Sequence, residues 1–208
     1  METLRPCTIH PMTGDAFRYT VAMCNLNNAS VLEKSIRSVA DQLDPRFELL
    51  VIDDGSTDGS LDVLEDLEAD YPFMRVVEGD NDNLGEARNH SFREASGTYV
   101  LESMDPDDMY GEGIQDFVFV FERLSEALDR EFYLKGRSIN MAPRSLLLNH
   151  PYRSLGYGED KDFWRRLFAS EKIIWLDHKP FYEILRDDYE RRDLMRNEFD
   201  KTVVEFRS

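Results

Sequence analysis

The sequence is poor in cysteine, in long apolar runs and in basic residues. Its 208 residues include two cysteines, Cys7 and Cys24, which are too few for a disulfide framework and form no Cys-x-x-Cys pair. No apolar stretch reaches the roughly 18 to 20 residues that span a bilayer, and the N-terminus lacks the basic start and apolar run of a signal peptide. We therefore expect a reduced, cytoplasmic protein with no transmembrane segment, whose contact with membranes, if it has any, is peripheral.

Positive charge is scarce. Lys and Arg total 25 against 42 Asp and Glu, which gives a net charge of -17. Proteins bind nucleic acids and anionic lipid surfaces through clustered basic residues. This charge balance therefore predicts no nucleic-acid partner and disfavours binding to anionic lipids. Acidic residues along the chain, with arginine far more frequent than lysine, also suggest a protein from a high-salt cytoplasm, such as that of a halophilic archaeon, because salt screens self-repulsion. The alternative is an ordinary acidic protein.

Short apolar runs alternate with helical patterns from Tyr19 onward. The runs at 19–24, 47–52, 74–77 and 99–102 read as strands, and the segments 31–41, 60–71 and 85–95 as helices. This alternation predicts an α/β fold whose mostly parallel central sheet is flanked by helices. Ligands of such sheets bind beyond the carboxyl ends of the strands.

The rest of the chain is less regular. An amphipathic helix is expected over 113–130, strands near 138–141, 173–176 and 181–185, a helix over 161–169, and a charged helix from about Tyr189. Residues 1–18 show no periodic spacing of apolar residues of the kind found in helices and strands. We therefore predict an irregular arm over 1–18 and one domain over 19–208.

Carboxylates follow two of the predicted strands. Asp54 ends the second strand, where its side chain can accept a hydrogen bond from a base N–H or a ribose hydroxyl, whereas Asp58 has the position of a helix cap. Asp105, Asp107 and Asp108 follow the fourth strand. Three carboxylates so close together repel one another unless a cation lies among them, and their oxygens suit Mg²⁺ or Mn²⁺. The alternative is an acidic cluster that arises from composition.

A third acidic motif opens the helix near residue 160. Glu159 and Asp160 follow a loop that contains Gly156 and Gly158. Such a pair either stabilises the N-terminal dipole of the helix or supplies a general base that takes a proton from an attacking hydroxyl. The spacing alone does not choose between these roles.

Five segments resemble, in order and spacing, the family 2 inverting glycosyltransferases: 53–58, 83–89, 95–99, 105–108 and 158–160. The resemblance is close over 19–110 and looser over 136–186. It implies a GT-A (nucleotide-diphospho-sugar transferase) fold, with a nucleotide-sugar-binding half at 19–110 and an acceptor-binding half at 111–208. It also implies transfer of a hexosyl group, with inversion, from a nucleotide-diphospho-sugar donor. UDP-sugar is the expected donor, and a glycan, lipid-linked or polysaccharide molecule the expected acceptor.

The resemblance also implies roles for single residues. Asp160 would be the catalytic base and Asp54 would contact the nucleotide base. Asp107 and Asp108 would bind Mn²⁺ or Mg²⁺, and the donor would contact the following residues: Asn27, Asp54, Asn83, Arg88, Asp105 and Asp107. Arg88 has an alternative role, which is to pair with a strand-end carboxylate for structure.

The sequence departs from the family pattern in two places. Leu26 stands where an aromatic residue usually stacks on the base, which leaves the identity of the base open. The histidine that often follows the last family arginine is absent after Arg186, and nearby His178 is either a metal ligand or a structural residue. A nucleotidyltransferase and a non-catalytic nucleotide- or glycan-binding relative are the alternative functions. The first normally needs a basic phosphate loop, and residues 24–29 are not basic.

Overall fold

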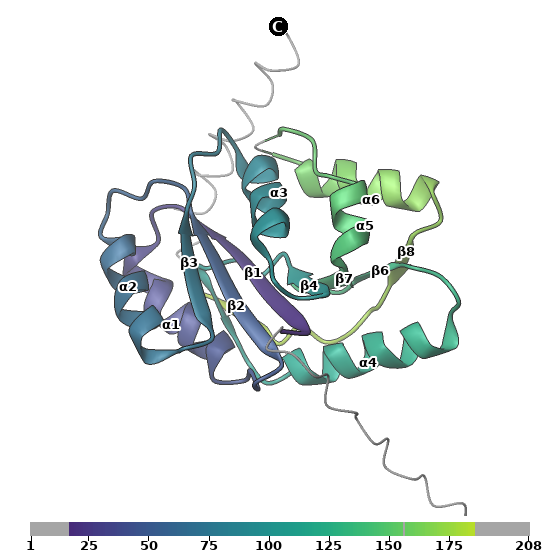
Figure 1. Ribbon diagram of the computed structural model, residues 1–208, viewed down its shortest axis with the longest axis horizontal. Helices are drawn as coiled ribbons and strands as arrows, with labels where there is room; N and C mark the ends of the chain where they lie inside the picture. Colours follow the sequence, from purple (N-terminus) through teal and green to yellow (C-terminus); the bar gives the residue numbers. More distant parts are fainter. Residues whose placement is uncertain (1–16, 156, 186–208) are drawn as a thin grey trace, which may run out of the picture.

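The computed structural model describes residues 17–155 and 157–185, and a mostly parallel sheet of seven strands is its centre (Figure 1). The strand order is β3-β2-β1-β4-β7-β6-β8. β7 runs antiparallel to its neighbours β4 and β6, and the other pairs are parallel. The strands are β1 (Tyr19–Asn25), β2 (Phe47–Asp53), β3 (Met74–Glu78), β4 (Tyr99–Glu102), β6 (Tyr133–Lys135), β7 (Asn140–Pro143) and β8 (Ile173–Trp175). The predicted α/β fold with a mostly parallel sheet is confirmed.

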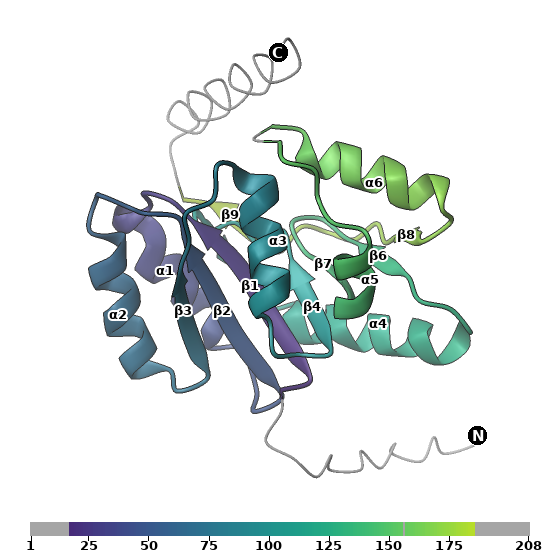
Figure 2. The same cartoon turned by 45° about the horizontal axis from the view of Figure 1, so that its top comes forward.

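Helices cover both faces of the sheet, as the turned view in Figure 2 shows. Side chains alternate along the strands, so that Val21 and Leu49 enter one core while Ala22 and Leu50 enter the other. Burial on both faces explains why these strands are continuous apolar runs. The first core is covered by α1 (Ala29–Ala40), α2 (Ser60–Asp70) and α4 (Ile114–Ala127), the second by α3 (Leu84–Glu94), α5 (Arg144–Asn149) and α6 (Glu159–Ala169).

The order of the strands creates a switch point between β1 and β4. The chain builds β1, β2 and β3 outward in one direction and then places β4 on the opposite side of β1. Loops that leave the carboxyl ends of β1 and β4 therefore diverge, and such a position is the usual ligand site of an open α/β sheet.

A two-stranded sheet lies beside the main sheet and holds the acidic loop. β5 (Asp108–Tyr110) pairs antiparallel with β9 (Tyr182–Ile184). The N–H of Leu185 donates to the carbonyl of Asp107 at 2.9 Å, and the N–H of Tyr110 donates to the hydroxyl of Ser38 on α1 at 2.9 Å. The acidic loop is therefore attached both to α1 and to a segment more than seventy residues later in the chain.

Most of the predicted elements are present with ends shifted by a few residues, and three short elements were missed. β5 and β6 have three residues each and α5 has six, which is too short for a hydrophobic period to be visible. The arm over 1–16 and the helix expected from Tyr189 lie outside the described residues. Within the described residues, the helices lack the length and apolar composition needed to cross a membrane.

Candidate active site at the carboxyl edge of the sheet

The loops after β1 and β2 are tied together by side-chain hydrogen bonds. Asp53 is fully buried and accepts from Asn25 Nδ2 at 2.7 Å and from the hydroxyl of Ser56 at 2.7 Å. Asn27 has a left-handed backbone, with φ of 57°, and its side-chain oxygen accepts from the N–H of Thr57 at 2.8 Å. Asp53 therefore shapes the turn, and Asn27 is held at the rim of the first loop.

Asp54 lies at the same edge but is only half buried. Asn81, from the loop after β3, donates its side-chain N–H to Asp54 Oδ1. Burial raises the pKa of the Asp54 carboxyl, while the hydrogen bonds from Asn81 act in the opposite direction. A Cβ on Gly79 would lie 2.2 Å from Asp54 Oδ1, so a larger residue there would displace the Asp54 side chain.

The segment at Asn83 contacts residues 153–155, which lie far along the chain. Asn83 caps α3 by accepting from the N–H of Glu86 at 3.1 Å, and its Nδ2 donates to the hydroxyl of Ser154 at 2.7 Å. A Cβ on Gly85 would lie 2.2 Å from the carbonyl oxygen of Arg153. This segment therefore docks residues 153–155 against the start of α3.

The acidic loop separates its three aspartates into two environments. Asp105 and Asp107 are partly exposed, whereas Asp108 is fully buried at the start of β5. Within residues 17–155 and 157–185, no three His, Cys, Asp or Glu side chains converge on one metal position. Mg²⁺ and Mn²⁺ need only one or two protein carboxylates when substrate phosphate and water complete their shells. Asp105 and Asp107 fit that requirement, whereas solvent does not reach Asp108.

Glu102, at the end of β4, is the centre of a buried polar network. Its exposed fraction is 1%, and a carboxylate so deeply buried needs several donors. The donors are Arg88 Nη1 at 2.9 Å, Asn140 Nδ2 at 2.9 Å, the hydroxyls of Ser103 and Tyr152 at 3.0 Å each, and the hydroxyl of Tyr133. Sequence reasoning missed this role of Glu102, although a carboxylate that ends an apolar strand was the visible signal.

Arg88 extends the network to the start of α6. The guanidinium is nine-tenths buried, and its Nε lies 3.6 Å from Glu159 Oε1. The aromatic ring of Tyr152 also packs against Arg88, with its centroid 5.5 Å from Arg88 Cζ. Of the two roles expected for Arg88, the structure places it against a strand-end carboxylate, which here is Glu102.

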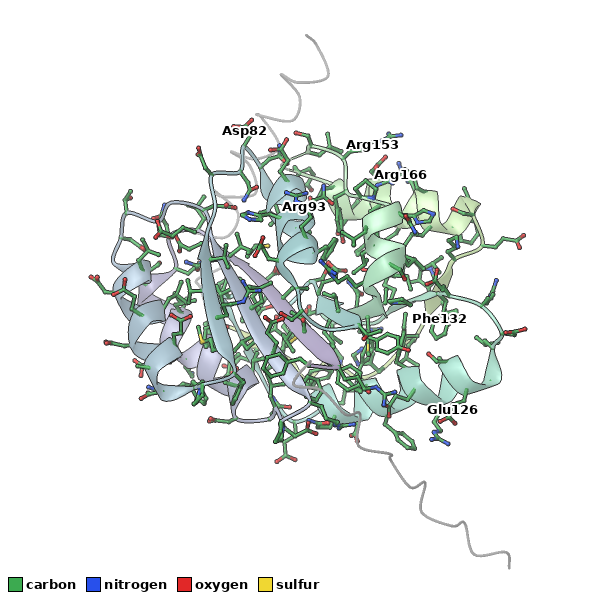
Figure 3. All side chains as sticks on the ribbon, in the orientation of Figure 1. Asp82, Arg93, Glu126, Phe132, Arg153 and Arg166 are labelled. Atoms are coloured by element: carbon green, nitrogen blue, oxygen red, sulfur yellow. The ribbon has the colours of Figure 1, made fainter. Side chains whose placement is uncertain are left out.

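The three carboxylates in the first turn of α6 have different surroundings. Burial raises the pKa of Glu159 to about 7, against the lowering effect of the Arg88 charge. Asp162 pairs with Arg153 at 3.0 Å and with Arg166 at 2.9 Å, and Figure 3 labels both arginines at the α6 side of the molecule. Asp160 is partly exposed and accepts from the backbone N–H of Lys161 at 2.6 Å.

Contacts place these groups around the end of β1: the N–H of Asp54 donates to the carbonyl of Asn25 at 3.0 Å, and Cys24, Arg88 and Asp105 line one small cavity. Burial raises the pKa of the Cys24 thiol to about 12, and the charges of Asp54 and Asp105 act in the same direction. The charge of Asp105 also raises the pKa of Glu159. The loops after β1, β2 and β4 and the start of α6 therefore face one space at the switch point.

His178 lies away from this space. Its Nε2 accepts from the backbone N–H of Arg137 at 2.9 Å, and its ring contacts Phe117 and Phe181 with centroid distances of 5.9 and 5.6 Å. These contacts support the structural role that the sequence left open. The groove beside it, of about 450 Å³, lies between α4 and residues 176–181.

The comparison with known families settles the classification. Residues 20–184 match the sequence model of glycosyl transferase family 2. The chain belongs to this family.

Two curated relatives show how far the similarity extends. The chain is 29% identical over 133 residues to the cholesterol galactosyltransferase of Borreliella burgdorferi, a match that covers 63% of this chain and 37% of the relative. It is 24% identical over 206 residues to the GalNAc(5)-diNAcBac-PP-undecaprenol beta-1,3-glucosyltransferase of Campylobacter jejuni, with 82% of this chain and 66% of the relative covered. The chain thus spans about one to two thirds of these relatives.

Solved structures share the fold. A S. aureus TarS fragment in complex with UDP-GlcNAc superposes with a TM-score of 0.68 at 19% identity, covering 83% of this chain and 59% of that one. Glucosyl-3-phosphoglycerate synthase from Mycobacterium tuberculosis, with Mn²⁺, UDP and phosphoglyceric acid, gives 0.67 at 18% identity, with 91% and 78% covered. The fold of the family 2 protein described here is therefore of the GT-A type, as the resemblance implied.

Proposed function

We propose that this family 2 protein transfers a hexosyl group from a nucleotide-diphospho-sugar to an acceptor hydroxyl, with inversion and with a divalent cation. The observation that supports the proposal is the gathering of Asp54, the acidic loop and the start of α6 at the β1–β4 switch point, where Asp105 and Arg88 line one cavity and Arg88 reaches Glu159 at 3.6 Å. Each group serves a different part of the donor or acceptor.

The donor is assigned to the loops after β1, β2 and β4. Asn27 and Asp54 would contact the nucleoside, with Asn83 at the adjacent rim, and Asp105 and Asp107 would meet the ribose and the diphosphate. Mn²⁺ or Mg²⁺ would be held by Asp107, and Asp105 is proposed as its companion in place of the expected Asp108 because Asp108 is fully buried. When bound, the cation neutralises charge on the diphosphate leaving group. UDP is the proposed nucleotide because solved relatives of the same fold hold UDP or UDP-GlcNAc.

The proposed chemistry is one in-line displacement. Asp160 takes the proton from the acceptor hydroxyl as its oxygen bonds to the anomeric carbon, and the bond from that carbon to the diphosphate oxygen breaks on the opposite face. Asp160 is preferred as the base because Glu159 and Asp162 both face arginines. A glycan or lipid-linked acceptor is proposed, since the Campylobacter relative is named for an undecaprenol-linked one.

A non-catalytic nucleotide-binding relative is the second candidate. Leu26 is 52% exposed beside Asn27, where the family usually has an aromatic residue for the base. The aliphatic side chain offers less contact to a base than a ring does, which favours weakened donor binding.

The test compares Asp107→Asn with Asp160→Asn in two measurements. Binding of UDP is followed by calorimetry with Mn²⁺ and with EDTA, and turnover by release of UDP from UDP-sugars. Asp107→Asn should lose the metal-dependent part of binding, since diphosphate beside carboxylates is repelled without the cation. Asp160→Asn should keep that binding and lose turnover by roughly 100-fold to 10,000-fold, the usual effect of removing a general base.

The control is Asp66→Asn, an exposed carboxylate on α2 outside the site. It should match the parent in both measurements. Equal UDP affinity with Mn²⁺ and EDTA would contradict the metal assignment. Turnover by Asp160→Asn at the parental rate would contradict its role as the base. If the parent bound UDP but turned over no UDP-sugar, the second candidate function, a non-catalytic nucleotide-binding protein, would be supported.

A further inference from the structure

An exposed aromatic groove lies on the outer side of α6. It has a volume of about 280 Å³ and is lined by Lys161, Trp164, Arg165, Phe168 and Trp175. The four helical residues follow an i, i+3, i+4, i+7 spacing and therefore share one face of α6. Trp175 is at the end of β8, the strand at the edge of the main sheet. Figure 2 shows α6 and β8 joined by a short turn.

Trp164 packs partly against the second core, but the core does not depend on Phe168 or Trp175. The inner face of α6 is filled by Phe163 and Leu167, which are fully buried. Phe168 is 72% exposed and Trp175 is 62% exposed. Single exposed aromatic side chains are common on protein surfaces and need no explanation. A cluster of them often marks a binding surface.

The walls of the groove are held in place before any ligand arrives. The rings of Trp164 and Trp175 meet edge to face, with centroids 6.1 Å apart, and Lys135 Nζ lies 3.9 Å from the first centroid and 4.8 Å from the second. The indole N–H of Trp164 donates to the hydroxyl of Tyr133 at 3.3 Å. Such fixed rings lower the entropy cost of binding.

The groove is adjacent to the proposed catalytic base. Trp164 comes one helical turn after Asp160 on the same side of α6, an axial step of about 6 Å, close to the length of one sugar ring. Lys135, between the two indoles, is near enough for the charge of Asp160 to raise its pKa against the lowering effect of burial. A saccharide whose reacting hydroxyl lies at Asp160 would therefore extend over these rings.

We propose that this groove is an acceptor subsite that binds a neutral pyranose ring of a glycan. The C–H face of a pyranose is apolar and packs on an aromatic plane, while its hydroxyls can accept hydrogen bonds from Lys161 and Arg165. The assignment as an acceptor subsite rests on the function proposed above, since it orients the glycan toward Asp160.

The charges around the groove favour a neutral saccharide over an anionic membrane surface. The two cations of α6 in the groove follow three carboxylates in the first turn of the same helix: Glu159, Asp160 and Asp162. A surface that recruits anionic lipid usually carries a cluster of about four to eight basic residues, whereas this groove has Lys161 and Arg165 in its lining and Lys135 beside its rings. The groove is open and shallow, so a saccharide would lie with one face against it.

Both tryptophans of the chain line this groove, so intrinsic fluorescence reports on it directly. The full chain is titrated with cellobiose, lactose and chitobiose, without donor or cation. A saturable change in emission with at least one disaccharide is expected. Phe168→Ala keeps both tryptophans and should weaken that binding about three- to tenfold, the range of one lost aromatic contact.

Phe119→Ala is the matched control, because Phe119 is a 58% exposed helical phenylalanine on α4. It should bind like the parent, and all three proteins should have the same melting temperature. No saturable change with any disaccharide, or equal affinity of the two variants, would overturn the proposal. A change produced by phosphatidylglycerol vesicles but not by disaccharides would overturn it in favour of a membrane surface.

A second comparison separates this proposal from the proposed function. Asp160→Asn should bind the disaccharide like the parent, since the groove does not include the base. Binding by both proteins together with turnover by neither supports the saccharide site and contradicts the transferase. If the parent transfers sugar to a glycan acceptor, and Phe168→Ala does so at the same rate at subsaturating acceptor, the subsite is contradicted. The proposed transferase function would still be supported.

Discussion

At the scale of single residues, identical carboxylates acquire different roles from their surroundings. Asp53 is buried, accepts three hydrogen bonds and shapes a turn. Asp54, its neighbour in sequence, remains half exposed at the carboxyl edge of the sheet. Glu102 is buried under five donors, and Glu159 is buried with Arg88 as its cation. Burial and partners, rather than residue type, therefore separate structural from chemical carboxylates.

Glu159 gives a prediction for the pH dependence of stability. Burial raises its pKa from an ordinary 4.5 to about 7, so folding favours the protonated form. Its contribution is fully present below about pH 4.5 and is lost as the pH rises through about 7. Glu159→Gln should remove this decline. The free energy of unfolding, measured with urea across that range, should fall less with pH in the variant than in the parent.

Glu65→Gln is the control, because Glu65 is exposed on α2. Its curve should follow that of the parent. Parallel curves for the parent and Glu159→Gln would show that the buried carboxyl does not change protonation in this range.

At the scale of secondary-structure elements, Asp58 links two helices. One carboxylate oxygen accepts from the N–H of Ala29, the first residue of α1, and the other from the N–H and hydroxyl of Ser60, the first residue of α2. The sequence suggested a cap on α2 alone. Asp58→Ala should lower the free energy of unfolding by about 1 to 3 kcal/mol, the effect of roughly two helix caps. Urea denaturation measures this.

The matched control is Asp62→Ala, which removes an exposed carboxylate from the first turn of the same helix. It should change stability by a few tenths of a kcal/mol through the helix dipole alone. Equal losses in the two variants would contradict the cap that joins α1 to α2.

At the scale of the whole molecule, the net charge of -17 sets the response to salt. Repulsion among surface carboxylates destabilises the compact state, and the Debye length falls to about 3 Å in molar salt, which screens that repulsion. The melting temperature should therefore rise in molar KCl, and by more than in the same concentration of neutral glycine betaine. An unchanged melting temperature in KCl would remove the halophilic hypothesis.

The sequence by itself determined the fold class and the edge of the sheet at which the candidate site lies. Apolar runs that alternate with helical periods predict a parallel sheet, and in such a sheet the residues after each strand must meet at one edge. Asp54 and the acidic loop were found in this way, because their placement depends on local pattern and chain direction. The roles of all these residues in binding substrate or metal, and that of Asp160 in catalysis, stay predictions.

Only the tertiary structure decided which of these side chains reach solvent and which distant residues meet. It buries Asp108 in β5, pairs Arg88 with Glu102, and brings Trp164 and Trp175 together from a helix and an edge strand. The segments concerned are short or far apart in the chain, so no hydrophobic period records their contacts. Burial and pairing of that kind arise from packing between elements, and packing depends on the whole fold rather than on neighbouring residues in the chain.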